Sequence, residues 1–140
     1  MRVFIADDSS LMRDLLKSII STIPGCDLTG EAKDSKEALQ WLLKQTCDVA
    51  ILDICMPGAS GILVLELVKK LQPDLIAMIL TNYPEAPFRK RCLAAGADFF
   101  FDKSKDFQKV GETLQALIAR FKPAPDAEKQ GGNLQANDKT

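Results

Sequence analysis

Short apolar segments alternate with longer segments of helical periodicity along this chain, and this alternation restricts its possible folds more than any other feature. The strand-length segments cover residues 2–6, 27–32, 48–52, 75–80 and 98–102. Each one precedes a stretch in which apolar residues recur at the spacing of a helix. Strands that alternate with helices of this length predict a parallel β-sheet with helices on both of its faces.

The strand order is predicted from handedness and polarity. Right-handed crossover connections leave few topologies, and the strongly apolar segments 2–6, 48–52 and 75–80 suit the centre of a sheet that is covered on both faces. The mixed polarity of 27–32 favours an edge position. We therefore predict an α/β fold, a flavodoxin-like three-layer sandwich with a five-stranded parallel sheet of order 2-1-3-4-5 and five helices.

Polar residues mark the starts of the predicted helices. The first helix begins near Ser9 or Ser10, directly after the first strand. The residues expected along its buried side recur at every fourth position: Leu11, Leu15, Ile19 and Ile23. Asp34, with Glu37 three residues later, has the pattern of a capping box that opens the second helix.

Size and composition predict one folded domain. The chain has 140 residues, 46% of them hydrophobic, and a net charge of −1, so no strong attraction to nucleic acid or to a membrane surface is expected. We place the domain at residues 1–121 and a flexible polar tail at 122–140. No apolar run reaches membrane length and no cleavable signal is visible, and the four scattered cysteines, without a Cys-x-x-Cys pair, indicate reduced thiols of a cytoplasmic protein. The chain has no histidine, which excludes catalytic sites that depend on imidazole.

Polar residues also follow the predicted strands where each strand ends. They are Asp7 and Asp8 after the first strand, Asp53 after the third, Thr81 after the fourth and Lys103 after the fifth. Ligands bind outside the carboxyl ends of the strands in open α/β sheets. Because the first and third strands are neighbours in the predicted order, their three carboxylates are expected to meet. Each residue alone is explained by a helix terminus, a turn or a solvated charge, but the ordered set favours a site.

These side chains suit magnesium-dependent phosphoryl chemistry. Three adjacent carboxylates raise one another's pKa unless a cation joins them, and Mg²⁺ is a hard cation that takes oxygen ligands. A carboxylate can accept a phosphoryl group and form an acyl phosphate. Lys103 and Thr81 would offer an ammonium and a hydroxyl to the phosphoryl oxygens.

In this pattern the chain resembles the receiver domain of two-component response regulators, most of all the stand-alone chemotaxis type. The resemblance covers about residues 1–121. The matching positions are Asp7-Asp8, Asp53, Met56-Pro57, Gly61, Thr81, Gly96-Ala97 and Lys103. It implies that Asp53 accepts a phosphoryl group from a sensor histidine kinase or a histidine phosphotransfer protein, with Mg²⁺ as the cofactor.

The resemblance also implies the metal ligands and the partners. Asp8, Asp53 and the backbone carbonyl of Cys55 would bind Mg²⁺ directly, and Asp7 would act mostly through water. The chain would catalyse only its own phosphorylation and dephosphorylation. A downstream protein target would read the signal, without direct binding to DNA or to a membrane, and the chain would be a monomer or a phosphorylation-dependent dimer.

Two positions match the switch of these domains. Thr81 would move toward a phosphoryl group that Lys103 also contacts, and Phe100 would turn inward behind it. This movement would reshape the face formed by the fourth helix, the fifth strand and the fifth helix. Plain core packing is the alternative for Phe100, which belongs to a run of three phenylalanines.

The chain departs from the family pattern at the positions around the site. Ser104 replaces the proline that usually follows the lysine, and we expect a trans bond there because a cis bond before a non-proline residue costs ~3 kcal/mol. Cys55 and Tyr83 occupy the positions that flank the phosphoryl group, and neither is a good base for positioning water. We therefore expect slow loss of phosphate.

Three other functions share parts of this pattern. A phosphatase of the haloacid-dehalogenase type needs an acid two residues after its aspartyl nucleophile, where this chain has Cys55. A flavodoxin-like nucleotide or flavin binder needs a phosphate loop rich in glycine, serine and threonine, where this chain has Asp7-Asp8. A receiver-like interaction module that works without phosphorylation stays compatible with the sequence.

Overall fold

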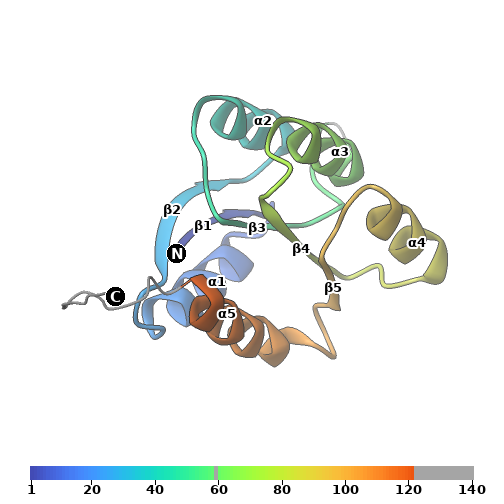
Figure 1. The fold of residues 1–140 in the computed structure, drawn as a ribbon. Helices are drawn as coiled ribbons and strands as arrows, with labels where there is room; N and C mark the ends of the chain where they lie inside the picture. Colours follow the sequence, from blue (N-terminus) through green and yellow to red (C-terminus); the bar gives the residue numbers. More distant parts are fainter. Residues whose placement is uncertain (59, 122–140) are drawn as a thin grey trace.

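A computed structural model describes residues 1–58 and 60–121, and the predicted tail at 122–140 lies outside them. Within these residues the strands are β1 (Arg2–Ala6), β2 (Asp27–Ala32), β3 (Val49–Leu52), β4 (Ile76–Thr81) and β5 (Phe99–Asp102). The helices are α1 (Ser10–Ser21), α2 (Ser35–Lys44), α3 (Gly61–Leu71), α4 (Ala86–Ala94) and α5 (Phe107–Phe121). Strands and helices alternate along the chain as predicted (Figure 1).

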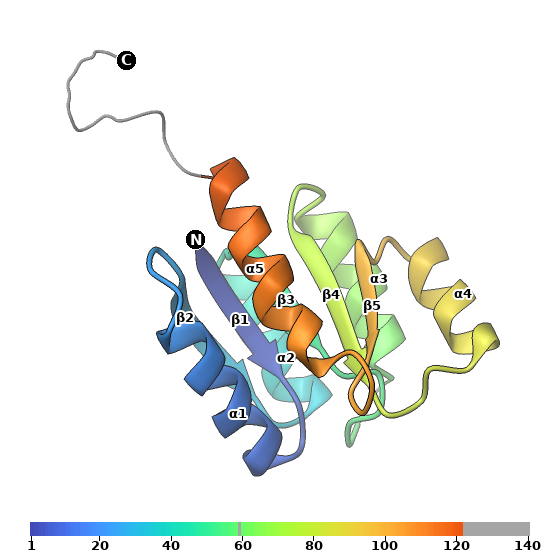
Figure 2. The same ribbon diagram turned by 90° about the horizontal axis from the view of Figure 1, so that it is seen from below.

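The sheet confirms the predicted fold and strand order. Neighbouring strands pair in parallel in the order β2-β1-β3-β4-β5. The central strands β1, β3 and β4 are almost wholly buried, while the more polar β2 forms an edge. Figure 2 shows the strands running in one direction, so that their carboxyl ends share one edge of the sheet.

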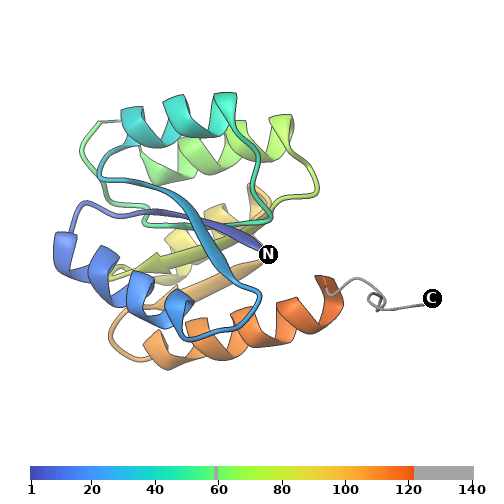
Figure 3. The same ribbon diagram turned by 90° about the vertical axis from the view of Figure 1, so that its left-hand side faces the viewer.

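Helices cover both faces of the sheet (Figure 3). α1 and α5 pack on one face, and α2, α3 and α4 pack on the other. Side chains alternate between the two cores along each central strand: Val3 and Ile5 of β1 belong to the first, and Phe4 and Ala6 to the second. Because both faces are covered, these strands are apolar at every position except Arg2, which begins β1, and Thr81, which ends β4.

Helix α1 turns a neighbouring row of residues to the sheet, and only the last two residues of the predicted row, Ile19 and Ile23, pack against the core between α1 and the sheet. The sheet contacts the row that contains Leu16 and Ile20, which are 1% and 2% exposed. Leu11 and Leu15, in the predicted row, are 69% and 43% exposed. Ile23 is buried, but it lies beyond the last residue of α1. The two apolar rows are adjacent on the helix, and a row spaced by four residues drifts around a helix of 3.6 residues per turn.

The polar residues predicted to open the first two helices do so. The Ser9 hydroxyl accepts a hydrogen bond from the Met12 amide at 3.2 Å, so α1 begins at Ser10. The Asp34 carboxylate accepts from the Glu37 amide at 2.8 Å. The Glu37 carboxylate in turn accepts from the amide of residue 33 at 3.0 Å. The reciprocal pattern confirms the capping box, with its second bond displaced by one residue.

The peptide bonds and the lengths of the helices also bear on the predictions. Residues 1–58 and 60–121 contain no cis peptide bond, so the bond between Lys103 and Ser104 is trans as expected. None of the helices in these segments is both long enough and apolar enough to cross a membrane.

Candidate phosphoacceptor and metal site

The buried acidic residues come from two neighbouring strands at one edge of the sheet. Ala6 of β1 pairs with Leu52 of β3, so the next residues, Asp7 and Asp53, leave the sheet side by side. The Asp53 amide donates to Ala6 O and the Asp7 amide to Ala32 O, each at 3.0 Å. These bonds extend the strand pairing to the acidic residues themselves, so the sheet sets where their side chains begin.

Lys103 bridges the two buried carboxylates. Its Nζ lies 2.7 Å from Asp7 Oδ2 and 3.1 Å from Asp53 Oδ2. All three side chains are at most 6% exposed, so water screens these ion pairs weakly. Lys103 follows β5, which is separated from β3 by β4. The ammonium therefore links residues from three strands that are far apart in the sequence.

Asp8 completes an acidic cluster with these residues. One carboxylate oxygen from each of Asp7, Asp8 and Asp53 lies within 4.8 Å of the others, which confirms the expectation that the three residues meet. Asp7 and Asp53 are buried, whereas Asp8 is exposed. Carboxylate oxygens gathered at a partly open edge fit Mg²⁺, which takes few protein ligands and keeps several waters.

The backbone holds the Asp53 side chain in place. Its Oδ1 accepts a hydrogen bond from the Cys55 amide at 3.1 Å, while Oδ2 accepts from Lys103. The loop after Asp53 returns tightly to the sheet, because a Cβ at Gly61 would collide with the Asp53 carbonyl oxygen. A larger residue at position 61 would therefore displace the backbone of Asp53.

Burial and charge shift the pKa values of this site. Burial raises the pKa of Asp53, and the nearby Asp7 carboxylate adds to this effect, against the lowering effects of Lys103 and of the Cys55 amide. Burial opposes the charge of Lys103, but hydrogen bonds and attraction from Asp7 and Asp53 raise its pKa overall. Lys103 is thus a stable cation, whereas the Asp53 carboxylate would gain from further positive charge.

The two predicted switch residues lie on the neighbouring strands. Thr81 ends β4 and is fully buried, and its Oγ1 accepts a hydrogen bond from the Tyr83 amide at 3.0 Å. Phe100 of β5 is 4% exposed and packs in the core beneath α2, α3 and α4. The Arg89 guanidinium of α4 lies 5.3 Å from the centroid of the Phe100 ring, within cation–π range. Phe100 thus connects β5 with α4.

A cleft of about 340 Å³ opens next to the loop that follows Asp53. Its lining residues are Ile54, Cys55, Ser60, Ile62, Tyr83, Phe88 and Arg91. Cys55 and Tyr83, the positions expected to flank a phosphoryl group, are both exposed. The loop beside Asp53 can therefore be reached from solvent.

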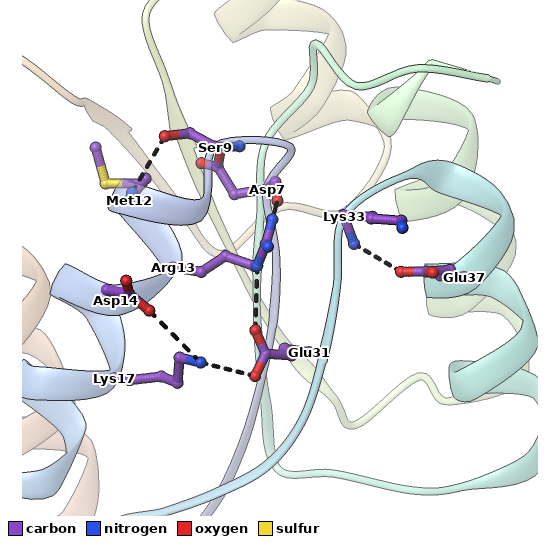
Figure 4. Close-up of polar contacts among 9 residues, drawn as sticks. All are labelled: Asp7, Ser9, Met12, Arg13, Asp14, Lys17, Glu31, Lys33 and Glu37. Carbon is purple, nitrogen blue, oxygen red and sulfur yellow. Dashed lines mark hydrogen bonds and ion pairs between the residues drawn. The ribbon is translucent and has the colours of Figure 1, made fainter.

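Sequence reasoning missed one residue that contacts the site. Arg13 of α1 donates from Nη1 to the Asp7 carbonyl oxygen at 2.7 Å and from Nε to Glu31 Oε1 at 3.1 Å (Figure 4). Lys17 Nζ lies 2.9 Å from the other Glu31 oxygen. The available signal was position alone, since Arg13 lies on the helix that directly follows the acidic pair.

Comparison with known proteins places the chain in a family. The model of the response regulator receiver domain matches residues 3–115. The chain is 33% identical over 137 residues to a putative transcriptional regulator of Pseudomonas aeruginosa, covering 98% of this chain and 66% of that protein. It is 34% identical over 127 residues to a protein-glutamate methylesterase/protein-glutamine glutaminase of Treponema denticola, covering 86% of this chain and 34% of that protein. The chain thus spans one to two thirds of these relatives.

Solved structures of similar proteins share the fold of this chain and part of its sequence. The response regulator domain of Thermotoga maritima CheB superposes with a TM-score of 0.75 at 32% identity, covering 86% of this chain and 94% of that one. CheY in the CheX–CheY–BeF₃–Mg complex of Borrelia burgdorferi has a TM-score of 0.75 at 27% identity, covering 88% and 90%. With the family match, the shared fold and the acidic cluster at the strand ends, this chain belongs to the response regulator receiver domain family.

Proposed function

We propose that this receiver domain works in a phosphorelay, in which Asp53 accepts a phosphoryl group from a phosphohistidine of a sensor histidine kinase or histidine phosphotransfer protein. The observation that carries this proposal is the buried Lys103 ammonium between the Asp7 and Asp53 carboxylates, with Asp8 beside them. A purely structural ion pair would balance its charges. Here two carboxylates share one ammonium and a third carboxylate, that of Asp8, lies within 4.8 Å of them, so negative charge is in excess, which suits a site that receives a cation.

The residues present can carry out the transfer. An Asp53 oxygen attacks phosphorus, and a P–O bond forms as the P–N bond to the donor histidine breaks. The imidazole leaves with the electron pair and is protonated on its other nitrogen. Lys103 Nζ lies 3.1 Å from Asp53 Oδ2. A small movement of the flexible lysine stem would therefore bring the ammonium to the phosphoryl oxygens. Thr81 would donate its hydroxyl to another of these oxygens.

A magnesium ion is the proposed cofactor. Asp8, Asp53 and the backbone carbonyl of Cys55 would hold it directly, with Asp7 acting mostly through water. When bound, Mg²⁺ would neutralise negative charge on the phosphoryl oxygens. The clustered carboxylates support this proposal, as does the similar CheY of Borrelia burgdorferi, whose complex contains BeF₃ and magnesium.

The signal is proposed to leave through α4, β5 and α5. The Phe100 ring lies below the Arg89 guanidinium, so a movement of Thr81 and Phe100 would act on α4. The exposed side chains of residues 89–91 give α4 a basic surface that would suit a downstream protein with acidic groups. This output would be a protein contact in the cytoplasm, without direct binding to DNA, made by a monomer or a phosphorylation-dependent dimer.

Phosphorylation by a small donor tests the proposal. Wild-type protein with acetyl phosphate and Mg²⁺ should gain the mass of one phosphoryl group, and removal of the metal by a chelator should prevent it. Asp53→Asn should gain none. Asp48→Asn is the matched control, because Asp48 precedes the same strand at its opposite end. It should be phosphorylated like the wild type.

Failure to accept a phosphoryl group would contradict the proposal. If wild-type protein gains no phosphoryl group from acetyl phosphate or from a phosphorylated phosphotransfer protein, the proposal is wrong. An interaction module that works without phosphorylation would then be the better account.

A further inference from the structure

Arg13 of α1 holds the loop that carries the acidic pair and ties it to the edge strand β2. Its guanidinium donates to the Asp7 carbonyl oxygen at 2.7 Å and to Glu31 of β2 at 3.1 Å (Figure 4). The side chain is 16% exposed, so its two bonds are largely shielded from water. Lys17 bonds to the same Glu31 carboxylate at 2.9 Å and helps to fix it. The guanidinium is therefore held between a strand and the acidic loop.

The carbonyl that Arg13 contacts belongs to the peptide unit between Asp7 and Asp8. A peptide unit is planar, so a bond to its oxygen fixes the orientation of the whole unit and the direction in which the next residue begins. The other polar groups of Asp7 already have partners. Its amide donates a hydrogen bond to the Ala32 carbonyl oxygen, and its carboxylate accepts one from the Ser9 amide and pairs with the Lys103 ammonium. The bond from Arg13 constrains the carbonyl oxygen, the one remaining polar group of Asp7.

Asp8 has less support of its own. It is exposed, and within residues 1–58 and 60–121 no ion pair involves it. Its carboxylate nevertheless lies within the acidic cluster. The direction of its side chain depends on the peptide unit that Arg13 holds.

We propose that Arg13 is a positioning residue for the metal site, and that it acts by fixing the Asp7–Asp8 peptide so that Asp8 points at the cation. This inference rests on the proposed function, since it assumes that the acidic cluster binds Mg²⁺. Metal affinity would then depend on an arginine of α1 that is bonded to the edge strand β2, as well as on the metal ligands themselves.

The charge of Arg13 and its positioning role predict opposite effects on Mg²⁺ affinity when the side chain is removed. A guanidinium near the cluster repels a divalent cation, although Glu31 offsets much of this effect. Charge alone therefore predicts that removal of Arg13 tightens Mg²⁺ binding. Positioning predicts weaker binding, because partners that orient metal ligands typically change affinity by about 10–100-fold. We expect Arg13→Ala to raise the Kd for Mg²⁺ by about tenfold.

Calorimetric titration of the full chain with Mg²⁺ measures this effect. Arg13→Lys keeps the charge and most of the stem, but one ammonium cannot reproduce the planar fork that joins Asp7 to Glu31, so it should also bind more weakly. Arg2→Ala is the matched control. Arg2 also donates to a backbone carbonyl, that of Thr46 at 2.9 Å, but at the opposite end of β1. Its variant should bind Mg²⁺ like the wild type.

A second measurement needs no metal. The Ser9 amide donates to Asp7 Oδ1, so its hydrogen exchange should be faster in metal-free Arg13→Ala than in wild-type protein. Unchanged or tighter Mg²⁺ binding by both Arg13 variants would overturn the inference and leave the proposed function standing. A wild-type protein that binds no Mg²⁺ would overturn both.

Discussion

Asp53 carries a charge that its surroundings compensate only in part. Its carboxylate is buried near that of Asp7, and one ammonium serves both. Burial of this kind disfavours the charged form of a carboxylate. Functional sites commonly keep such groups at a cost in stability, because binding or chemistry needs them. A neutral side chain of the same shape should therefore make the metal-free fold more stable.

We expect Asp53→Asn to raise the melting temperature at neutral pH in the absence of metal. The pKa of Asp53 is raised in the folded protein, mainly by burial, so the folded state loses stability as the pH rises from the unfolded pKa through the folded one. The asparagine variant avoids this loss. Its advantage should vanish below that pH window, which a series of thermal melts across acidic and neutral pH would show. A lower melting temperature for the variant at neutral pH would contradict this account.

Cys55 is the thiol that we expect to react in the native protein. It is exposed, whereas Cys26, Cys47 and Cys92 are buried. Burial raises the pKa of Cys47 to about 12 and also raises the pKa values of Cys26 and Cys92, which keeps these groups protonated at neutral pH. Iodoacetamide should add once to native protein and not at all to Cys55→Ser, as measured by intact mass. Rapid addition of a second group to folded wild-type protein would show that the core is more accessible than the structure indicates.

The same exposed position bears on the lifetime of the phosphorylated state. Neither Cys55 nor Tyr83 offers a group that orients water well, so we expect the wild-type phosphate to decay slowly. Cys55→Glu places a carboxylate at the rim and should speed the loss of phosphate by about tenfold or more. Decay of the isolated phosphoprotein, followed by intact mass over time, measures both rates. Loss within minutes from the wild type would refute the prediction.

Between helix α2 and the sheet, one aromatic residue forms a close packing contact with two strands. Trp41 of α2 stacks on Phe4 of β1, with ring centroids 4.5 Å apart. The same ring covers Gly30 of β2 so closely that a Cβ there would lie 2.5 Å from it. The edge strand therefore needs a glycine at this point for α2 to pack over it.

Gly30→Ala should destabilise the fold by about 1–3 kcal/mol, because Trp41 must move to make room. Urea unfolding followed by the fluorescence of Trp41, the single tryptophan, measures the loss. Gly111→Ala in α5 is the control: its added methyl group would meet Ile19 at an ordinary 3.4 Å. Alanine is favoured over glycine within a helix by about 1 kcal/mol, so this variant should be as stable as the wild type or more so. Equal stability of Gly30→Ala and wild type would contradict the packing described.

The order in which strands and helices are connected and packed could be predicted from the sequence more completely than the contacts of single side chains. The strand order and the meeting of Asp7, Asp8 and Asp53 follow from alternation, handedness and where the strands end. The buried side of α1 does not follow, because the helix has two adjacent apolar rows and contact with the sheet selects one of them. The bond from Arg13 to the Asp7 carbonyl depends on side-chain direction, which periodicity does not encode.

Chemical trapping reveals whether Asp53 forms an acyl phosphate. Borohydride reduces an aspartyl phosphate to homoserine, so the modified position can be read by mass spectrometry of the digested protein. After reaction with acetyl phosphate and Mg²⁺, then reduction, the account predicts homoserine at position 53. Homoserine at Asp7 or Asp8 instead, or at no position, would contradict it.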